Sequence, residues 1–491
     1  MTRSILRTLL SGGLAGAVLL APAWVGAADI SLSGGGIKIT EGELEFKIGG
    51  RLMMDWDYYD GMYHWAGNDG KYGSDNEPAS DDPGAEYNID NGAATSDFEY
   101  RRLRLTFEGR SSDALSYKMT YDFDVADGGG GETGITDLLV QYKGLEFGTL
   151  TIGKFKRPAG LEELTSSKRI STIERSSLMN SGAFSVGRPD GFGVRLDSAT
   201  DNFVWAFGLF NETGNKDENG ANQYEIGGRA VYFIETDDAL YHFGLSLLGG
   251  DTGFGGTKRV QDRFGVHTAN KQNLTSGSKA VDGFSQNGIE LAYRRGPFSV
   301  QFELMNSSWD AGADTFAALP DSAGDYAFEA GTTAPTTGAD TRRKYSDWSA
   351  SSAGGIDATG NYILVTYTLT GEPRTYKRGV FDRVAPSGEG GAWELVFRRE
   401  TLEVERTVKR RRHSIANDKT GAVAAADVET AIEDRIVTRE GAATTLGVNW
   451  HVNKNVRAMY NFIQGEVTFN DLPNILDDSG NAHTFRVQFD F

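Results

Sequence analysis

The end of the chain carries the pattern that most limits what this sequence can fold into. Over residues 484–491, apolar and polar side chains alternate strictly. One parity is apolar: Phe485, Val487, Phe489 and Phe491. The other parity is polar: Thr484, Arg486, Gln488 and Asp490. A period of two predicts a β-strand with one apolar face and one polar face.

The same alternation recurs along most of the chain. Near its start, Leu44, Phe46 and Ile48 share one parity, while Lys47 and Arg51 take the other. Candidate strands begin near residues 44, 97, 115, 135, 147, 189, 202, 222, 238, 286, 297, 357, 392, 438, 453 and 481. We therefore predict an all-β fold, a transmembrane antiparallel β-barrel of about 16 strands, since bacterial single-chain barrels have even strand numbers. A barrel of that size encloses an aqueous channel.

The connections between these strands fall into two kinds. Four are short: Thr200–Asp201, Thr236–Asp238, Arg295–Pro297 and His451–Asn455. Four are long and polar: about 61–96, 251–285, 306–356 and 402–437, the last with an alanine-rich, helix-prone piece around 421–434. Short turns at one end and long loops at the other are expected of an outer-membrane barrel. Long inserts in a soluble β-protein are the alternative.

The first residues predict an export signal. Arg3 and Arg7 precede an apolar run from Leu9 to Leu20, and small residues up to Ala28 form a cleavage zone. The run is shorter than the about 20 residues of a spanning helix. We expect a signal peptide over 1–28, a short periplasmic N-terminal segment over 29–43 and the barrel over 44–491. No other long apolar run follows, and only a closed barrel crosses a membrane without helices.

Composition excludes several functions. The chain has no cysteine, which removes thiolate nucleophiles and cysteine-ligated metals and suits an oxidising compartment. Its net charge of −19 disfavours nucleic acid as a partner. The six histidines have no ligand spacing, and no nucleophile or phosphate-loop motif appears. We expect no enzyme, no cofactor and no metal site.

Parity also places basic residues inside the barrel. A cation on the lipid face near the membrane midplane costs about 2–4 kcal/mol, so charges opposite apolar neighbours should point inward. The inward candidates are Lys47, Arg51, Arg102, Arg104, Lys118, Arg195, Arg398, Arg457 and Arg486. Each one can either line an ion path or pair with an inward carboxylate of the wall, and inward charge alone specifies neither role.

Several blocks resemble one family. Residues 152–176 read IGKFKRPAGLEELTSSKRISTIERS, and residues 98–109 read FEYRRLRLTFEG. Residues 369–399 and 444–466 add two further blocks. Together they resemble the phosphate-selective porin O and P family. The terminal Phe491 resembles the end signal by which the barrel-assembly machinery recognises outer-membrane barrels.

The resemblance implies a 16-stranded homotrimeric porin in the bacterial outer membrane, surrounded by its lipid. It implies that a long loop, about Arg157 to Arg188, folds into the lumen and narrows it. It places an anion path at Arg102, Arg104, Lys154, Lys156, Lys168, Arg169 and Arg175. Phosphate preference belongs to certain family members. The strongly acidic composition of this chain departs from the family pattern.

The function expected from this is a passive water-filled channel for small anions, among them phosphate or polyphosphate. A general or cation-preferring diffusion porin remains open, because Asp122, Asp124, Glu108, Glu303 and Glu394 also point inward. A plugged barrel with a structural or adhesive role remains open as well.

Overall fold

Sixteen strands form a closed wall in the computed structural model of the chain. The structure describes residues 29–33, 36–63, 94–123, 134–189, 191–212, 219–253, 256–275, 278–312, 345–350, 355–415, 428–469 and 478–491. The expected signal peptide over 1–28 lies outside them. Each strand pairs antiparallel with the next, and the last pairs with the first. The predicted antiparallel barrel is therefore confirmed.

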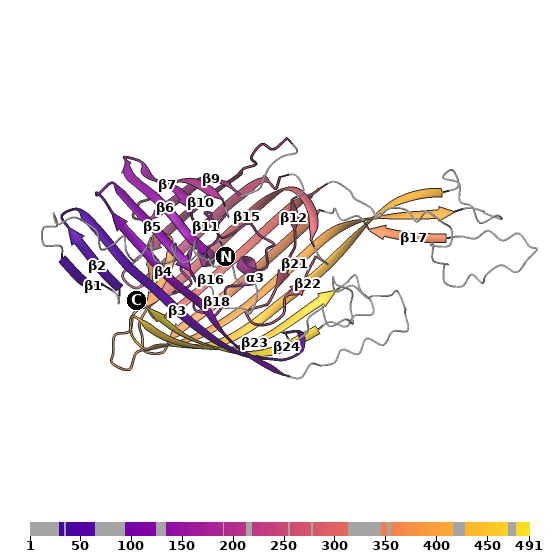
Figure 1. Cartoon of the computed structure of the whole chain (residues 1–491). Helices are drawn as coiled ribbons and strands as arrows, with labels where there is room; N and C mark the ends of the chain where they lie inside the picture. Colours follow the sequence, from indigo (N-terminus) through magenta and orange to yellow (C-terminus); the bar gives the residue numbers. More distant parts are fainter. Residues whose placement is uncertain are drawn as a thin grey trace, which may run out of the picture.

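The wall strands can be followed in chain order in Figure 1. They are β3 (Leu44–Tyr59), β4 (Thr95–Arg110), β5 (Leu115–Asp122), β6 (Gly134–Leu145), β7 (Gly148–Lys154), β8 (Phe192–Ala199), β9 (Phe203–Asn211), β10 (Glu225–Glu235), β11 (Ala239–Asp251), β15 (Lys279–Arg295), β16 (Phe298–Ala311), β18 (Ile356–Thr368), β21 (Ala392–Ile415), β22 (Val428–His451), β23 (Val456–Phe469) and β24 (Asp478–Asp490).

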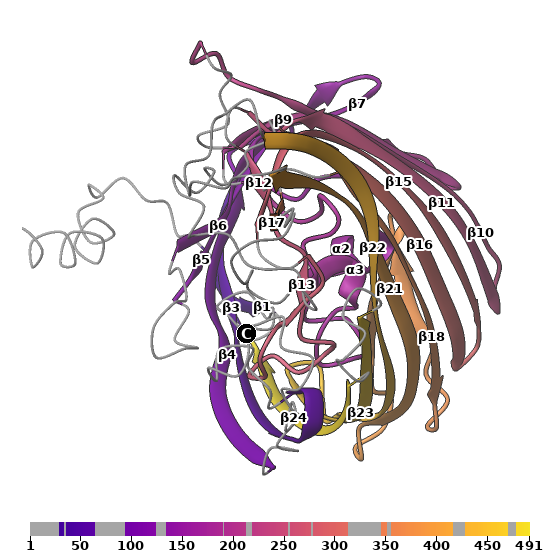
Figure 2. The same ribbon diagram turned by 90° about the vertical axis from the view of Figure 1, so that its right-hand side faces the viewer.

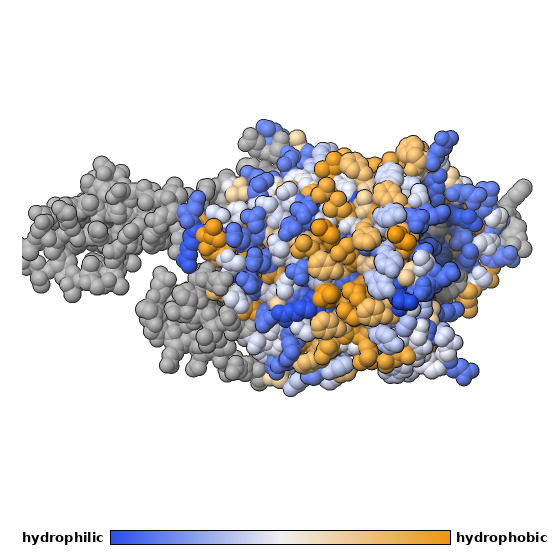
Figure 3. Space-filling model, turned by 180° about the vertical axis from the view of Figure 1, so that it is seen from behind, coloured by the Kyte–Doolittle hydropathy of each residue, from blue (hydrophilic) through white to orange (hydrophobic). Residues whose placement is uncertain are grey.

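Period-two alternation explains which way the side chains point. Along β11, Tyr241, Phe243, Leu245 and Leu247 are exposed, whereas His242 and Ser246 at alternate positions are buried. Apolar side chains on the outside of a barrel face lipid, and the inner face is polar. Figure 3 shows the hydrophobic residues gathered across the middle of the molecule, with hydrophilic residues toward its ends.

All the short turns lie at one end of the wall. Neighbouring strands run in opposite directions, and each of these turns follows an even-numbered strand of the wall, counted from β3. Residues 111–114, 146–147, 200–202, 236–238, 296–297 and 452–455 link β4–β5, β6–β7, β8–β9, β10–β11, β15–β16 and β22–β23. We call this the turn end. A hairpin of β1 (Asp29–Ser33) and β2 (Gly36–Glu41) extends the sheet there by pairing β2 with the first residues of β3.

One long connection differs from the expected loop. The predicted loop over about 402–437 is largely strand, since β21 runs to Ile415 and β22 begins at Val428. Residues 428–434 are extended, so the helix expectation around 421–434 is wrong for them. The backbone there pairs in register with β21, Lys409 opposite Asp434 and Arg410 opposite Glu433, so these residues continue the sheet. In Figure 1 this extension and β17 (Tyr345–Ala350) project beyond the other strands.

Three segments pack against the inner face of the wall. The first, residues 155–189 between β7 and β8, contains α2 (Leu161–Leu164) and α3 (Ser177–Asn180), and we call it the inner segment. The second, residues 256–275, contains β12 (Thr257–Lys258), β13 (Gln261–Asp262) and β14 (Gln272–Asn273). The third is a hairpin of β19 (Arg374–Lys377) and β20 (Val380–Val384). Figure 2 shows α2, α3 and β13 within the curve of the wall.

The apolar core lies between these segments and the wall. Leu178 and Phe184 of the inner segment, with Phe264 of the second segment, pack against wall residues such as Met305 and Ile463. Short helix η1 (Gly61–Tyr63), which follows β3, contributes two more buried side chains to the same cluster. The inner segments are thus held by packing as well as by polar contacts.

Candidate functional site

Three arginines of the wall hold the inner segment in place. The Arg486 guanidinium binds Asp55 at 2.7 and 2.6 Å and Glu174 at 2.7 Å. Arg398 donates to the Thr172 hydroxyl and to the Glu174 carbonyl, both at 2.8 Å. Arg457 donates to the Ile170 carbonyl at 2.8 Å. Because all three side chains are almost fully buried, they anchor the segment and present no donor to water.

Wall carboxylates complete this anchoring. Both oxygens of Glu303 accept backbone N–H groups at the start of α2, from Leu161 and Glu162, at 2.7 Å each. Glu394 accepts the Ser171 hydroxyl at 2.9 Å. Glu303 thus satisfies backbone N–H groups of a buried segment that has lost its hydrogen bonds to water, and Glu394 satisfies a hydroxyl of the same segment.

The other side of the inner segment faces β3–β6, where basic side chains keep contact with water. Lys47 pairs with Glu108 at 3.2 Å, and Lys118 lies 3.7 Å from Asp137. Arg104 pairs with Asp122 at 2.5 Å. The exposed fraction of these cations runs from 16% for Arg104 to 39% for Lys118, so a hydrated ion can reach them.

Three cations of the inner segment lie toward the same wall. Arg175 approaches Glu163 at 3.3 Å and donates to the Thr165 carbonyl at 2.8 Å. Lys156 pairs with the same Glu163 at 2.9 Å. Arg188 donates to Asp137 of β6 at 2.8 Å. Burial would raise the pKa of Glu163, but Arg175 and Lys156 hold that pKa at about 2, so this acid stays ionised.

Arg51 joins the two groups. It donates to the Ser167 hydroxyl of the inner segment and lies within electrostatic range of three arginines and one acid: Arg104, Arg175, Arg188 and Asp490. Within the described residues, no carboxylate lies within salt-bridge distance of it. We call the set the basic path: Lys47, Arg51, Arg104, Lys118, Lys156, Arg175 and Arg188. Its seven cations meet four paired carboxylates, Glu108, Asp122, Asp137 and Glu163.

A β-bulge brings in one arginine that alternation places on the lipid side. Asp55 lies opposite Glu99, but Met53 lies opposite Arg102, so β4 carries one extra residue between them. As a result both Arg101 and Arg102 turn inward. Arg101 binds Glu174 at 2.9 Å, while Arg102 is buried and its Nη1 lies 3.8 Å from the Met53 sulfur. In the sequence, two adjacent arginines on a strand that otherwise alternates were the signal that could have indicated this bulge.

Two further expected residues lie away from the basic path. Lys154 ends β7, two residues after Ile152, whose side chain is exposed. Arg195 of β8 pairs with Asp197 at 3.0 Å, and its guanidinium lies 5.0 Å from the centre of the Phe155 ring. It faces a separate pocket at the turn end.

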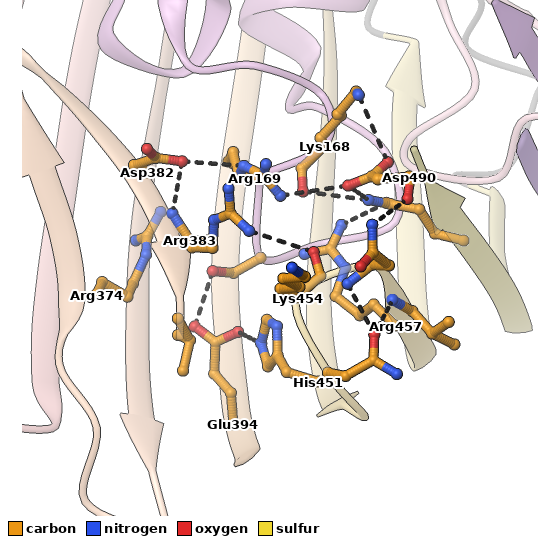
Figure 4. Close-up of a pocket in the computed structure, with 16 residues that line it drawn as sticks. Lys168, Arg169, Arg374, Asp382, Arg383, Glu394, His451, Lys454, Arg457 and Asp490 are labelled. Carbon is orange, nitrogen blue, oxygen red and sulfur yellow. Dashed lines mark hydrogen bonds and ion pairs between the residues drawn. The ribbon is translucent and has the colours of Figure 1, made fainter. Parts of the chain in front are cut away.

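Lys168 and Arg169 of the inner segment lie in a cluster at the turn end of the barrel, shown in Figure 4. Lys168 donates to the Gly50 carbonyl at 2.8 Å and lies 3.9 Å from Asp490. Arg169 bridges Asp490 at 3.3 Å and Asp382 of the hairpin at 2.9 Å. Burial lowers the pKa of Lys168 to about 8, despite the nearby Asp490.

Arg374 and Arg383 of the hairpin line this cluster, and alternation did not single them out. The Arg374 guanidinium is buried over the Phe381 ring, 4.3 Å from its centre. Arg383 donates to the Lys454 carbonyl of a neighbouring turn at 3.2 Å. Only the fold of the hairpin into the barrel brings them there.

Among the described residues, no group of three or more His, Asp or Glu side chains is placed to hold a metal ion. Over the same part of the chain, no helix is long and apolar enough to cross a membrane.

A closed 16-stranded barrel with a lipid-facing apolar exterior and a polar, charge-lined interior defines a porin. The family described as "Phosphate-selective porin O and P" matches residues 74–491, and the chain belongs to that family. It is an outer-membrane porin.

Relatives and solved structures resemble it over nearly the whole chain. "Porin O" of Pseudomonas aeruginosa is 25% identical over 493 residues, which covers 95% of this chain and 93% of that protein. The solved outer membrane protein OmpT of Vibrio cholerae has a TM-score of 0.48 and 12% identity, covering 92% of this chain and 99% of that chain. An anion-selective porin from Comamonas acidovorans has a TM-score of 0.48 and 11% identity, covering 91% and 100%.

Proposed function

We propose that the protein is a passive channel that prefers small anions, and that the basic path conducts them. The observation that carries this proposal is the imbalance of charge along a water-accessible wall, where seven cations meet four carboxylates. An excess of fixed positive charge in a narrow, low-dielectric passage raises the local concentration of anions.

The inner segment narrows the channel in this proposal. Its anchored side rests on buried arginines, and its other side carries Lys156, Arg175 and Arg188. An anion that passes between this side and β3–β6 exchanges water for guanidinium and ammonium donors. Because each donor already has a partner or a like-charged neighbour, no single site binds deeply, and the ion can leave.

Phosphate is the anion that we place first among the candidates. The family is described by phosphate selectivity, and arginine grips an oxyanion with two parallel N–H groups. The same family resemblance supports a homotrimer, and we propose that the barrel acts as a channel and not as an enzyme. A general or cation-preferring porin is the outcome that the following test must reject.

The test is the reversal potential of the purified porin in a planar bilayer under a chloride gradient, with phosphate added afterwards. We expect an anion-side potential and a chloride current that phosphate reduces. A cation-side potential would reject anion preference, and a silent membrane would favour a plugged barrel. A current that phosphate leaves unchanged would reject the phosphate assignment alone.

A charge-neutral variant tests the path itself. Arg51→Gln removes the one path cation without a carboxylate partner among the described residues, so the anion preference should fall without exposing an unpaired acid. Arg295→Gln is the matched control, because Arg295 ends β15, away from β3–β6, with 69% of its side chain exposed. Equal shifts from both variants would contradict the basic path.

A further inference from the structure

A separate pocket opens at the turn end, between β6–β10, the inner segment and the tip of the β19–β20 hairpin. Its volume is about 260 Å³. We propose that this turn-end pocket binds an organic anion that joins a carboxylate to a small apolar body, of which benzoate is a simple example. The inference deepens the proposed function, on which it rests, by naming a class of solute.

The pocket carries an excess of positive charge. Lys143, Arg195 and Arg378 line it together with one acid, Asp197. Arg195 binds Asp197 at 3.0 Å, and Arg378 approaches the other oxygen of that carboxylate at 3.7 Å. Within the described residues, the Lys143 ammonium has no hydrogen-bond or ion-pair partner. Three cations face one carboxylate, so the remaining positive charge favours a second carboxylate, which a ligand would supply.

Part of the pocket lining is apolar. Leu164 of the inner segment, Val204 of β9 and Val380 of the hairpin line it. Val204 and Val380 continue a buried cluster that includes Leu161 and Phe381. An inorganic anion gains nothing from such a surface, whereas an aromatic or aliphatic body gains by leaving water. Mixed lining of this kind is typical of sites for small organic ligands.

The hairpin tip is fixed before any ligand arrives. Arg378 has a φ of +50°, a left-handed conformation that residues other than glycine adopt rarely. The tip is held there because Arg229 donates to the Gly379 carbonyl at 2.9 Å. Arg229 is itself paired with Glu290 at 2.5 Å. Arg378 and Gly379, whose φ values are both positive, form the two-residue turn that joins β19 to β20, and Arg378 lines the pocket from this turn.

The stem of the hairpin is docked as firmly as the tip. The Tyr376 hydroxyl and His242 Nδ1 lie 2.6 Å apart, and the ring of Phe381 is buried against Leu161 and Leu240. The apolar and basic sides of the pocket are therefore preformed. A preformed site loses little entropy when a ligand binds, so a small organic anion can be held without any closing movement.

The experiment compares benzoate with acetate as blockers of chloride current through the full-length porin in planar bilayers. We expect half-block by benzoate at a concentration about tenfold below that of acetate, because burial of the ring on the apolar side adds to the shared carboxylate contact. Arg378→Gln should raise the benzoate concentration for half-block about fivefold, the upper end for a partly exposed ion pair. Val380→Thr should remove part of the preference for benzoate over acetate.

Lys377→Gln is the matched control. Lys377 is the neighbour of Arg378, is exposed and does not line the pocket, so its loss should leave the benzoate block unchanged. Equal potency of acetate and benzoate, or equal effects of the two variants, would overturn the inference. The reversal potential in the same membranes reports on anion preference separately. A cation-side potential would overturn the proposed function, and benzoate binding by calorimetry would then decide the pocket by itself.

Discussion

Arg486 Nη2 of the last strand and Glu174 Oε1 of the inner segment lie 2.7 Å apart, and both side chains are almost fully buried. The same guanidinium holds both oxygens of Asp55 on β3. One side chain thus links the inner segment to the seam where β24 meets β3. Burial would raise the pKa of Glu174, but Arg101 and Arg486 hold that pKa well below its usual value.

Neutralising Glu174 should loosen this link. Glu174→Gln removes the negative charge that the Arg101 and Arg486 guanidiniums share. Removing one partner of a buried ion pair costs about 3–5 kcal/mol. We expect a lower temperature of barrel unfolding on heat-modifiability gels and a larger, noisier single-channel conductance. Glu108→Gln is the matched control, since Glu108 is 44% exposed and, in the part of the chain that the structure describes, forms an ion pair with Lys47 alone. Equal losses from both variants would contradict the anchoring role.

Alkaline pH should weaken the anion preference. Burial lowers the pKa of Lys168 to about 8 and that of Lys156 to about 7. A lysine is charged below its pKa, so both ammonium groups are lost as pH rises from 6 to 9. Glu163, whose pKa Arg175 and Lys156 hold at about 2, stays ionised over that range, and guanidinium groups are not deprotonated in proteins. The reversal potential under a chloride gradient should therefore move toward the cation side.

The double variant Lys156→Arg with Lys168→Arg separates this cause from others. Guanidinium groups stay protonated through this pH range, so the reversal potential should become independent of pH. A variant that retains the full pH response would assign the titration to other groups of the channel. Lys168→Arg alone should keep only the step near pH 7 that belongs to Lys156.

Strand positions were predictable because alternation is a local signal. The last strand shows it without interruption from Thr484 to Phe491, and β24 lies there. The first residues of β22 were not predicted as a strand, because the alanine-rich sequence there does not alternate. They form a strand by pairing with β21. Arg101 was not predicted to point inward, because the bulge in β4 shifts the alternation by one residue.

The roles of the inward arginines were not predictable from alternation. Arg104 and Arg398 have the same parity signature, yet Arg104 is 16% exposed beside Asp122 and Arg398 is 1% exposed beneath the inner segment. The difference depends on where residues 155–189 pack, which is a contact between parts of the chain far apart in sequence. Parity therefore finds inward cations, and only the fold separates those that reach water from those that anchor.

Loss of Arg188 should weaken anion preference by two effects. Its guanidinium is removed from the basic path, and Asp137, which it binds at 2.8 Å, loses its nearest partner. Arg188→Gln should shift the reversal potential further than Arg51→Gln, which exposes no acid. The double variant Arg188→Gln with Asp137→Asn should recover part of the shift. No recovery in the double variant would show that Asp137 does not face the conducting path.

The last residue closes the wall at the turn end, and its deletion should impair assembly. Phe491 accepts from the Gly50 N–H at 2.7 Å and donates to the Gly50 carbonyl at 3.2 Å, while its ring stacks on Phe489 at 5.8 Å. Deleting Phe491 removes its two hydrogen bonds to Gly50 and the predicted end signal, so less heat-modifiable barrel should reach the outer membrane. Phe491→Tyr keeps the aromatic ring and both backbone bonds, and it should assemble normally. Deletion without loss of assembled barrel on gels would refute the end-signal role, and equal loss in the tyrosine variant would refute the seam explanation.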